Sequence, residues 1–168
     1  MTRGLNYDPV EGARQRWLEK GWTDSADGMA AVVSVMRAEQ IFLNEATEIL
    51  RPLGLTFARY QVLGMLRWNE SMTLGVLGNH LWITAATVTN AIDRLEGAGL
   101  CQRQSHPDDA RATLAQITPK GRKVFDRAVE QLNATLFSTV GLDAEELHQL
   151  VRLVRKIRVA AGDTVADS

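Results

Sequence analysis

The sequence predicts a mainly α-helical chain that carries one small β-hairpin. Apolar residues recur at helical spacing over most of the 168 residues. Between Gly99 and Thr118 this spacing gives way to short segments that alternate in polarity. The predicted order is two helices, a compact cluster of three short helices, the hairpin, and two further helices.

The first two helices are predicted from capping and stop signals. Asp8 followed by Pro9 is an N-cap acid with proline at the first helical position, and it opens a short helix. A longer helix is expected to begin at Ser25 or Asp27 and to end at residues 52–54, where Pro and Gly interrupt it.

Three short helices follow, each preceded by a threonine that can cap its N-terminus. The caps are Thr56, Thr73 and Thr84, and helical spacing gives each helix an apolar face. The expected inward-facing residues are Tyr60, Leu63, Leu66, Leu74, Leu77, Leu81, Val88, Ile92 and Leu95. The last two helices are joined by a tight turn, so residues 74–95 are typical of a helix-turn-helix.

The alternating segments predict a hairpin directly after the third short helix. Residues 100–103 and 113–117 are the expected strands, and residues 105–110 form a polar loop rich in turn formers. A hairpin in this place is the wing of a winged helix-turn-helix, and Arg111 beside Asp109 can enter a narrow minor groove. The alternative is a surface ion pair worth about 0–1 kcal/mol.

Two more helices are expected after the hairpin. Thr118-Pro119 restarts a helix, and Asp143 with Glu146 forms a capping-box pattern for the last one. The expected apolar face of the first of them is Val124, Ala128, Leu132 and Leu136. A small cluster cannot cover the apolar stripes of the long first helix and the last helices, so a second copy of the chain is expected to cover them.

These elements suggest a division of the chain. Residues 1–24 are an N-terminal extension, residues 25–52 and 118–161 form dimerisation helices, and residues 53–117 form the winged helix-turn-helix. Residues 162–168 are expected to be a disordered tail.

The outward face of the third short helix is the expected DNA-reading surface. It is small near its start and polar beyond, which lets a helix approach base edges in the major groove. The alternative is an amphipathic helix that simply faces solvent. The expected DNA-binding residues are Thr84, Ala85, Ala86, Thr87, Thr89, Asn90, Arg94, Asp109 and Arg111.

Four motifs together resemble the MarR family of bacterial regulators. They are Leu55-Thr56, the run TAATVTNAIDRLEGAGL at residues 84–100, PDDAR at residues 107–111, and ITPKG at residues 117–121. The resemblance implies a homodimer that binds a pseudo-palindromic operator in double-stranded DNA, as a repressor that a small molecule releases. It also implies that Arg94 holds a phosphate and that Asp109 orients Arg111. Trp82 departs from the small or polar residue usual at that turn.

A small anionic or aromatic effector has four candidate contacts: Trp17, Arg37, Arg59 and Gln61. The early helix with Trp17 is similar to a urate-sensing subgroup of the family, although Gln61 stands where that subgroup has an acid. The alternative for Trp17 is a packing anchor.

Composition excludes several other classes of protein. Net charge is −1, and no apolar run reaches the roughly 20 residues of a membrane span. A single cysteine, Cys101, and the lack of a secretory signal favour the cytoplasm, and a structural role is favoured for the thiol over redox sensing. Phosphate-binding loops and nucleophile motifs are missing, so neither an enzyme nor a cofactor is expected. The histidines are scattered without carboxylate or cysteine partners at ligand spacing, so no metal is expected. A winged-helix module used only for protein contacts is the alternative function.

Overall fold

The computed structural model describes residues 6–107, 109, 112–138 and 140–163. The chain forms two compact units, Met1–Leu132 and Asn133–Ser168. Among the described helices, none combines the length and apolar character that a bilayer span needs. Of the predicted C-terminal tail, residues 164–168 lie outside the described part of the chain.

The first unit begins with two helices in contact, α1 (Pro9–Glu19) and α2 (Thr23–Leu50). Asp8 caps α1 as predicted, since its carboxylate accepts from the Val10 N–H at 2.8 Å. The predicted start of α2 at Ser25 or Asp27 is wrong by at least two residues. The Ser25 hydroxyl instead donates to the Trp22 carbonyl at 3.3 Å, inside the first turn of a helix that no side chain caps.

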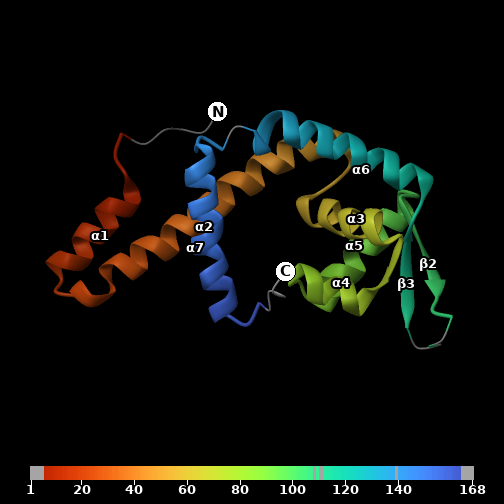
Figure 1. Cartoon of the computed structure of the whole chain (residues 1–168), viewed down its shortest axis with the longest axis horizontal. Coiled ribbons are helices and arrows are strands. Elements are labelled where there is room, and N and C mark those ends of the chain that lie inside the picture. The colour runs from red at the N-terminus through yellow and green to blue at the C-terminus, as the bar shows by residue number, and fades with distance from the viewer. Residues whose placement is uncertain (1–5, 108, 110–111, 139, 164–168) are drawn as a thin grey trace. The chain divides into compact units, whose positions relative to one another are not determined.

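Three short helices form the body of the first unit (Figure 1). They are α3 (Phe57–Asn69), α4 (Leu74–Leu81) and α5 (Ala85–Gly97), with a 3₁₀ turn, η1 (Arg51–Leu53), before them. Thr56, Thr73 and Thr84 each accept a backbone N–H at the start of these helices, which confirms the three predicted caps. The fully buried side chains of this cluster include Leu63, Leu66, Leu77, Val88, Ile92 and Leu95.

Three strands rather than two form the sheet. The predicted hairpin is present as β2 (Cys101–Ser105) and β3 (Thr113–Ile117), with Arg103 opposite Ala115. A third strand, β1 (Ser71–Thr73), pairs antiparallel with the other edge of β3, so the order is β1-β3-β2. Strand β1 was not predicted, because it is three residues long and its last residue, Thr73, is also the cap of α4.

Helix α6 (Pro119–Leu132) closes the first unit and packs against α3 and α2. The Thr118 hydroxyl accepts from the Gly121 N–H at 3.0 Å and donates to the Gly99 carbonyl at 2.8 Å, which ties the start of α6 to the end of α5. The buried face of α6 carries Phe125 where the prediction had Val124. The Phe125 ring fills the space against α3, where it stacks on Tyr60 with 5.3 Å between centroids.

The second unit holds a π-helical turn, η2 (Asn133–Phe137), and α7 (Ala144–Ala160). The predicted capping box is confirmed. The Asp143 carboxylate accepts from the Glu146 N–H at 2.9 Å, and the Glu146 carboxylate accepts from the Asp143 N–H at 2.9 Å.

Two residues other than glycine adopt the left-handed backbone region, Glu70 at φ 64° and Trp82 at φ 53°. Trp82 directly follows α4, and the Gly78 carbonyl accepts from both the Trp82 and the Ile83 N–H groups. Glycine usually takes this position after a helix, because a side chain there costs about 1 kcal/mol. Trp82, a residue type that is not usual at this turn, therefore also has a left-handed backbone conformation.

Candidate nucleic-acid interface

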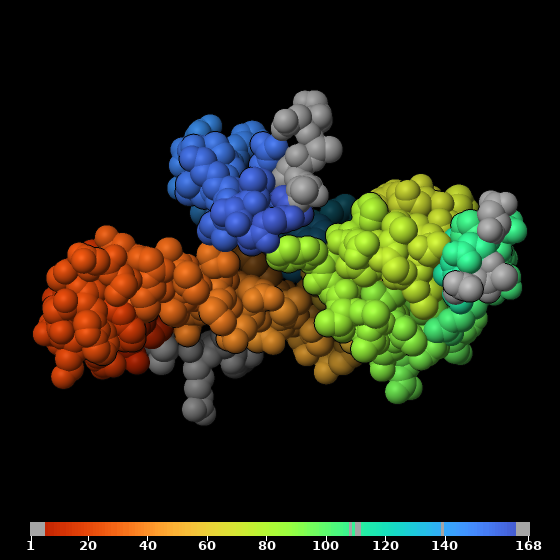
Figure 2. All heavy atoms as spheres, turned by 90° about the horizontal axis from the view of Figure 1, so that it is seen from below, coloured from red at the N-terminus to blue at the C-terminus, as the bar shows by residue number. Residues whose placement is uncertain are grey.

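Helix α5 has one buried and one exposed face, as the periodicity predicted. Val88, Ala91, Ile92 and Leu95 are buried against the rest of the first unit. The opposite face exposes small residues first and polar residues further along: Ala85, Ala86, Thr89, Asn90 and Asp93. The space-filling view shows α3–α5 as one continuous body with the hairpin at its edge (Figure 2). Such a helix can lie in a major groove without bulky side chains holding it away.

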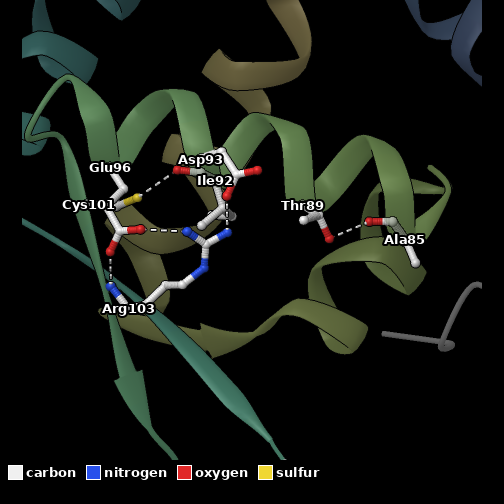
Figure 3. A network of polar contacts seen from close by, with 7 residues as sticks. All are labelled: Ala85, Thr89, Ile92, Asp93, Glu96, Cys101 and Arg103. Carbon is white, nitrogen blue, oxygen red and sulfur yellow. Dashed lines mark hydrogen bonds and ion pairs between the residues drawn. The ribbon is translucent and has the colours of Figure 1, made fainter.

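Hydrogen bonds distinguish the polar residues on this exposed face. The Thr89 hydroxyl donates to the Ala85 carbonyl at 2.9 Å (Figure 3), and the Thr84 and Thr87 hydroxyls bond each other at 2.9 Å. Within the described part of the chain, the Asn90 amide has no hydrogen-bond partner. Asn90 therefore offers both a donor and an acceptor to a molecule outside the chain, as bidentate pairing with adenine requires.

An open depression of about 480 Å³ lies between the start of α3 and the exposed face of α5. Asn90, Arg94 and Arg59 all line it, so two guanidinium groups and a free amide share one surface. The Arg59 Nε–H donates to the Thr56 hydroxyl at 3.2 Å, which holds its side chain against the N-terminus of α3. This arrangement suits an anion with several oxygens, such as a phosphodiester.

The depression brings together Arg59 and Arg94, which were predicted to bind different partners. Arg59 was predicted to contact an effector and Arg94 to contact DNA, whereas both line one depression. Ala86 and Thr87, which were predicted DNA contacts, also line it, and so do Thr56, Ala58 and Ala91, which were not among the predicted site residues. The sequence could have indicated the N-terminus of α3, because the Thr56 cap precedes Arg59 by three residues.

The other three candidate effector contacts lie on different elements. The Trp17 ring on α1 packs edge-on against Trp22, with centroids 5.1 Å apart, which is the contact a packing anchor would make. Arg37 is exposed on α2, and Gln61 is partly buried on α3. No hydrogen bond, ion pair or ring contact among the described residues joins these three side chains to one another.

The wing is fastened to α5 through Arg103, which the sequence analysis did not single out. The Arg103 backbone N–H donates to Glu96 at 2.8 Å, and its guanidinium donates to Glu96 and Asp93, each at 2.5 Å (Figure 3). The backbone N–H and the guanidinium of Arg103 lower the pKa of Glu96, so this carboxylate stays ionised as an acceptor. Asp93 and Glu96 are spaced three residues apart on one helix face, a signal that could have indicated a shared cation.

The tip of the wing is described only in part. Asp109 is exposed, and its carbonyl accepts from the Ala112 N–H at 3.0 Å. Arg111 lies outside the described residues, so its insertion into a minor groove and its pairing with Asp109 stay predictions.

Cys101 is buried at the start of β2, with its Sγ 3.8 Å from the Ile92 carbonyl. Burial raises the pKa of the Cys101 thiol to about 11. The thiolate, which is the reactive form, is then about one part in ten thousand at pH 7.

We therefore expect Cys101 in the folded protein to react with a disulfide dye at pH 8 at least about 100-fold more slowly than in urea-unfolded chain. Absorbance of the released thiolate measures both rates, and free cysteine serves as the reagent control. Equal rates would contradict the buried position of the thiol.

In the described part of the chain, His, Cys, Asp and Glu residues do not gather in groups that could hold a metal ion.

Comparison with known families and structures identifies relatives of this chain. The model of the MarR family matches residues 55–113, which span α3–α5 and β2 and end at the first residue of β3. A MarR family transcriptional regulator from Streptomyces coelicolor is 39% identical in its crystal structure, with a TM-score of 0.75 over 83% of this chain and 99% of that chain.

Two further solved structures are similar. BpsR from Bordetella bronchiseptica, whose DNA binding is regulated by 6-hydroxynicotinic acid, is 29% identical, with a TM-score of 0.69 over 76% of this chain and 97% of its own. A mutant of MarR from Escherichia coli complexed with operator DNA is 24% identical, with a TM-score of 0.73 over 79% of this chain and 96% of its own. At 24% identity, the similarity to MarR from Escherichia coli shows the fold alone.

Proposed function

The chain belongs to the MarR family of transcriptional regulators, and from this membership we propose that it acts in the cytoplasm as a homodimeric repressor that binds a pseudo-palindromic operator in double-stranded DNA. One observation carries the proposal. Asn90, Arg94 and Arg59 share an open depression on the exposed face of α5, beside a hairpin fastened to the same helix. Base-reading and phosphate-holding groups thus lie on one surface, as groove recognition requires.

The roles of these residues follow from their chemistry. The Asn90 amide reads an adenine edge in the major groove, because it can donate and accept at once. Arg94 and Arg59, which line the same depression, hold the phosphate backbone beside the groove and set the position of α5 without reading sequence. In this proposal Arg111 enters the adjacent minor groove.

We expect Asn90→Ala to weaken binding to the best operator by about 1–3 kcal/mol and to relax the preference at one symmetric base position. Operators selected from random duplexes provide the sites, and titration by fluorescence anisotropy measures affinity. Asn69→Ala is the matched control, because its amide already donates to the Met65 carbonyl at 2.8 Å. Unchanged affinity and preference in Asn90→Ala would remove Asn90 from base reading.

The proposed dimer rests on exposed apolar residues in both units. Those on α2 are Val32, Val33, Val35, Met36, Ile41, Phe42 and Leu43, and those on α7 are Leu150, Val151, Leu153, Ile157 and Val159. Exposed apolar side chains in this number on a helix mark a protein–protein interface, and a second copy is the partner that symmetric operators require.

Light scattering at micromolar concentration is therefore expected to give twice the 18.6 kDa chain mass. A double variant, Val151→Glu with Ile157→Glu, should shift the mass toward that of a monomer, because two charges then stand in the apolar stripe of α7. Glu145→Lys, on the polar first turn of the same helix, is the control. A stable monomer in the unmodified protein would contradict the dimer.

An effector that releases DNA is part of the proposal, supported by the relative that responds to 6-hydroxynicotinic acid. Adding small aromatic carboxylates to the operator titration tests this part. A chain that binds no duplex at low salt would overturn the proposed function and favour the module for protein contacts.

A further inference from the structure

The two non-glycine residues in the left-handed region differ in what their side chains do. Glu70 is held there by contacts: its carboxylate pairs with the Arg122 guanidinium, and its carbonyl accepts from the Ile117 N–H at 3.1 Å. The Arg122 hydrogen bond lowers the pKa of Glu70, so the pair is charged at neutral pH. The unfavourable backbone of Glu70 is therefore offset inside the protein.

Trp82 has no such compensation within the described part of the chain. Its side chain is 66% exposed, and no hydrogen bond or ring contact joins it to another described residue. A large apolar ring in water and a strained backbone are both unfavourable, and glycine at this position would avoid both. A strained, exposed residue of this kind indicates a contact that the isolated chain does not make.

The position of Trp82 indicates what that contact is. Two residues separate it from Ala85, the first residue of α5, and Thr84 between them caps that helix. In helix-turn-helix proteins the N-terminal end of the recognition helix enters the major groove, so the turn before it stands at the rim of the groove. The rim is formed by sugars and phosphates, which accept hydrogen bonds from side-chain N–H groups.

We propose that Trp82 is a DNA-backbone contact, with its ring against a deoxyribose and its indole N–H donating to a phosphate oxygen at the edge of the groove. This inference rests on the proposed DNA binding. It accounts for the exposed ring, because the sugar covers it in the complex, and for the strained backbone, which aims the side chain away from the protein. An indole has a donor and no acceptor, so it suits a phosphate and cannot read a base by bidentate pairing.

Two variants test the contact. Trp82→Gly removes the side chain and relieves the backbone, so Tm should stay the same or rise by a few degrees while operator affinity falls about tenfold for each half-site. Trp82→Phe keeps a ring but lacks the N–H donor. Trp68→Phe is the matched control, since Trp68 is 70% exposed on α3 beside Phe125, and its affinity should equal that of the unmodified protein.

Ethylation of single phosphates locates the contact. One symmetric phosphate should be needed by the unmodified protein and dispensable in both Trp82 variants. The inference is overturned if Trp82→Gly binds as tightly as the unmodified protein, if Trp82→Phe still needs every phosphate, or if either variant becomes monomeric. An unmodified protein that binds no duplex overturns the proposed function as well, which separates the two failures.

Discussion

Replacing Gly121 with alanine is expected to lower the free energy of unfolding by about 3 kcal/mol, at the upper end of what overpacking costs. A Cβ at this position would overlap the Leu100 carbonyl and lie 2.9 Å from the Ile117 side chain. The carbonyl cannot move away freely, because it accepts from the Thr118 N–H at 3.1 Å. Backbone would therefore have to separate where α5, β2 and α6 meet.

Urea unfolding followed by circular dichroism measures this change. Gly75→Ala in α4 is the matched control, because a Cβ there meets nothing within 4 Å. The control should be neutral or stabilising by up to about 1 kcal/mol, since alanine is the better helix former. Equal stability of Gly121→Ala and the unmodified protein would show that the contact between α6 and the β2 region is loose.

Replacing Arg94 with alanine is expected to weaken operator binding on the order of 100-fold at low salt, because a dimer loses two charge-assisted hydrogen bonds to phosphate. The loss should be similar on operator and scrambled duplexes, since phosphates carry no sequence information. The slope of log affinity against log salt should become shallower by about 1.8, because two fewer phosphates are neutralised. Anisotropy titrations at several salt concentrations measure both quantities.

Arg16→Ala on α1 removes the same charge away from α5 and should leave the slope unchanged. Arg59→Ala is expected to behave like Arg94→Ala, because both guanidinium groups line one depression. If Arg94→Ala weakened only the operator and kept the full salt slope, Arg94 would be a base reader and the assignment of roles in the depression would be wrong.

The sequence predicted those parts of the fold that depend on near neighbours. Thr56, Thr73 and Thr84 were recognised as caps because the hydroxyl and the N–H that it accepts are three residues apart. Strand β1 was missed because its partner, β3, lies about forty residues later and nothing in three residues reveals the pairing. The start of α2 was misplaced because no side chain caps it.

The candidate site divides in the same way. The exposed face of α5 follows from helical period alone, so Asn90 and Arg94 could be predicted. The meeting of Arg59 with Arg94 depends on how α3 packs on α5, and the bond from Arg103 to Glu96 depends on the hairpin returning to the helix. Both are tertiary contacts, which the spacing of residues along one element does not encode.

The bonds from Arg103 to Asp93 and Glu96 affect how a dimer of this protein fits two half-sites on DNA. Three hydrogen bonds join α5 to β2, so a movement of one against the other has to break them. The distance between the two DNA-binding regions of a dimer, by contrast, can change while these bonds stay intact in each protomer. Successive major-groove faces recur every 34–36 Å or so along the duplex. An effector therefore needs only to change this distance by a few ångströms to make the dimer lose one half-site, and the contacts between α5 and β2 can stay as they are.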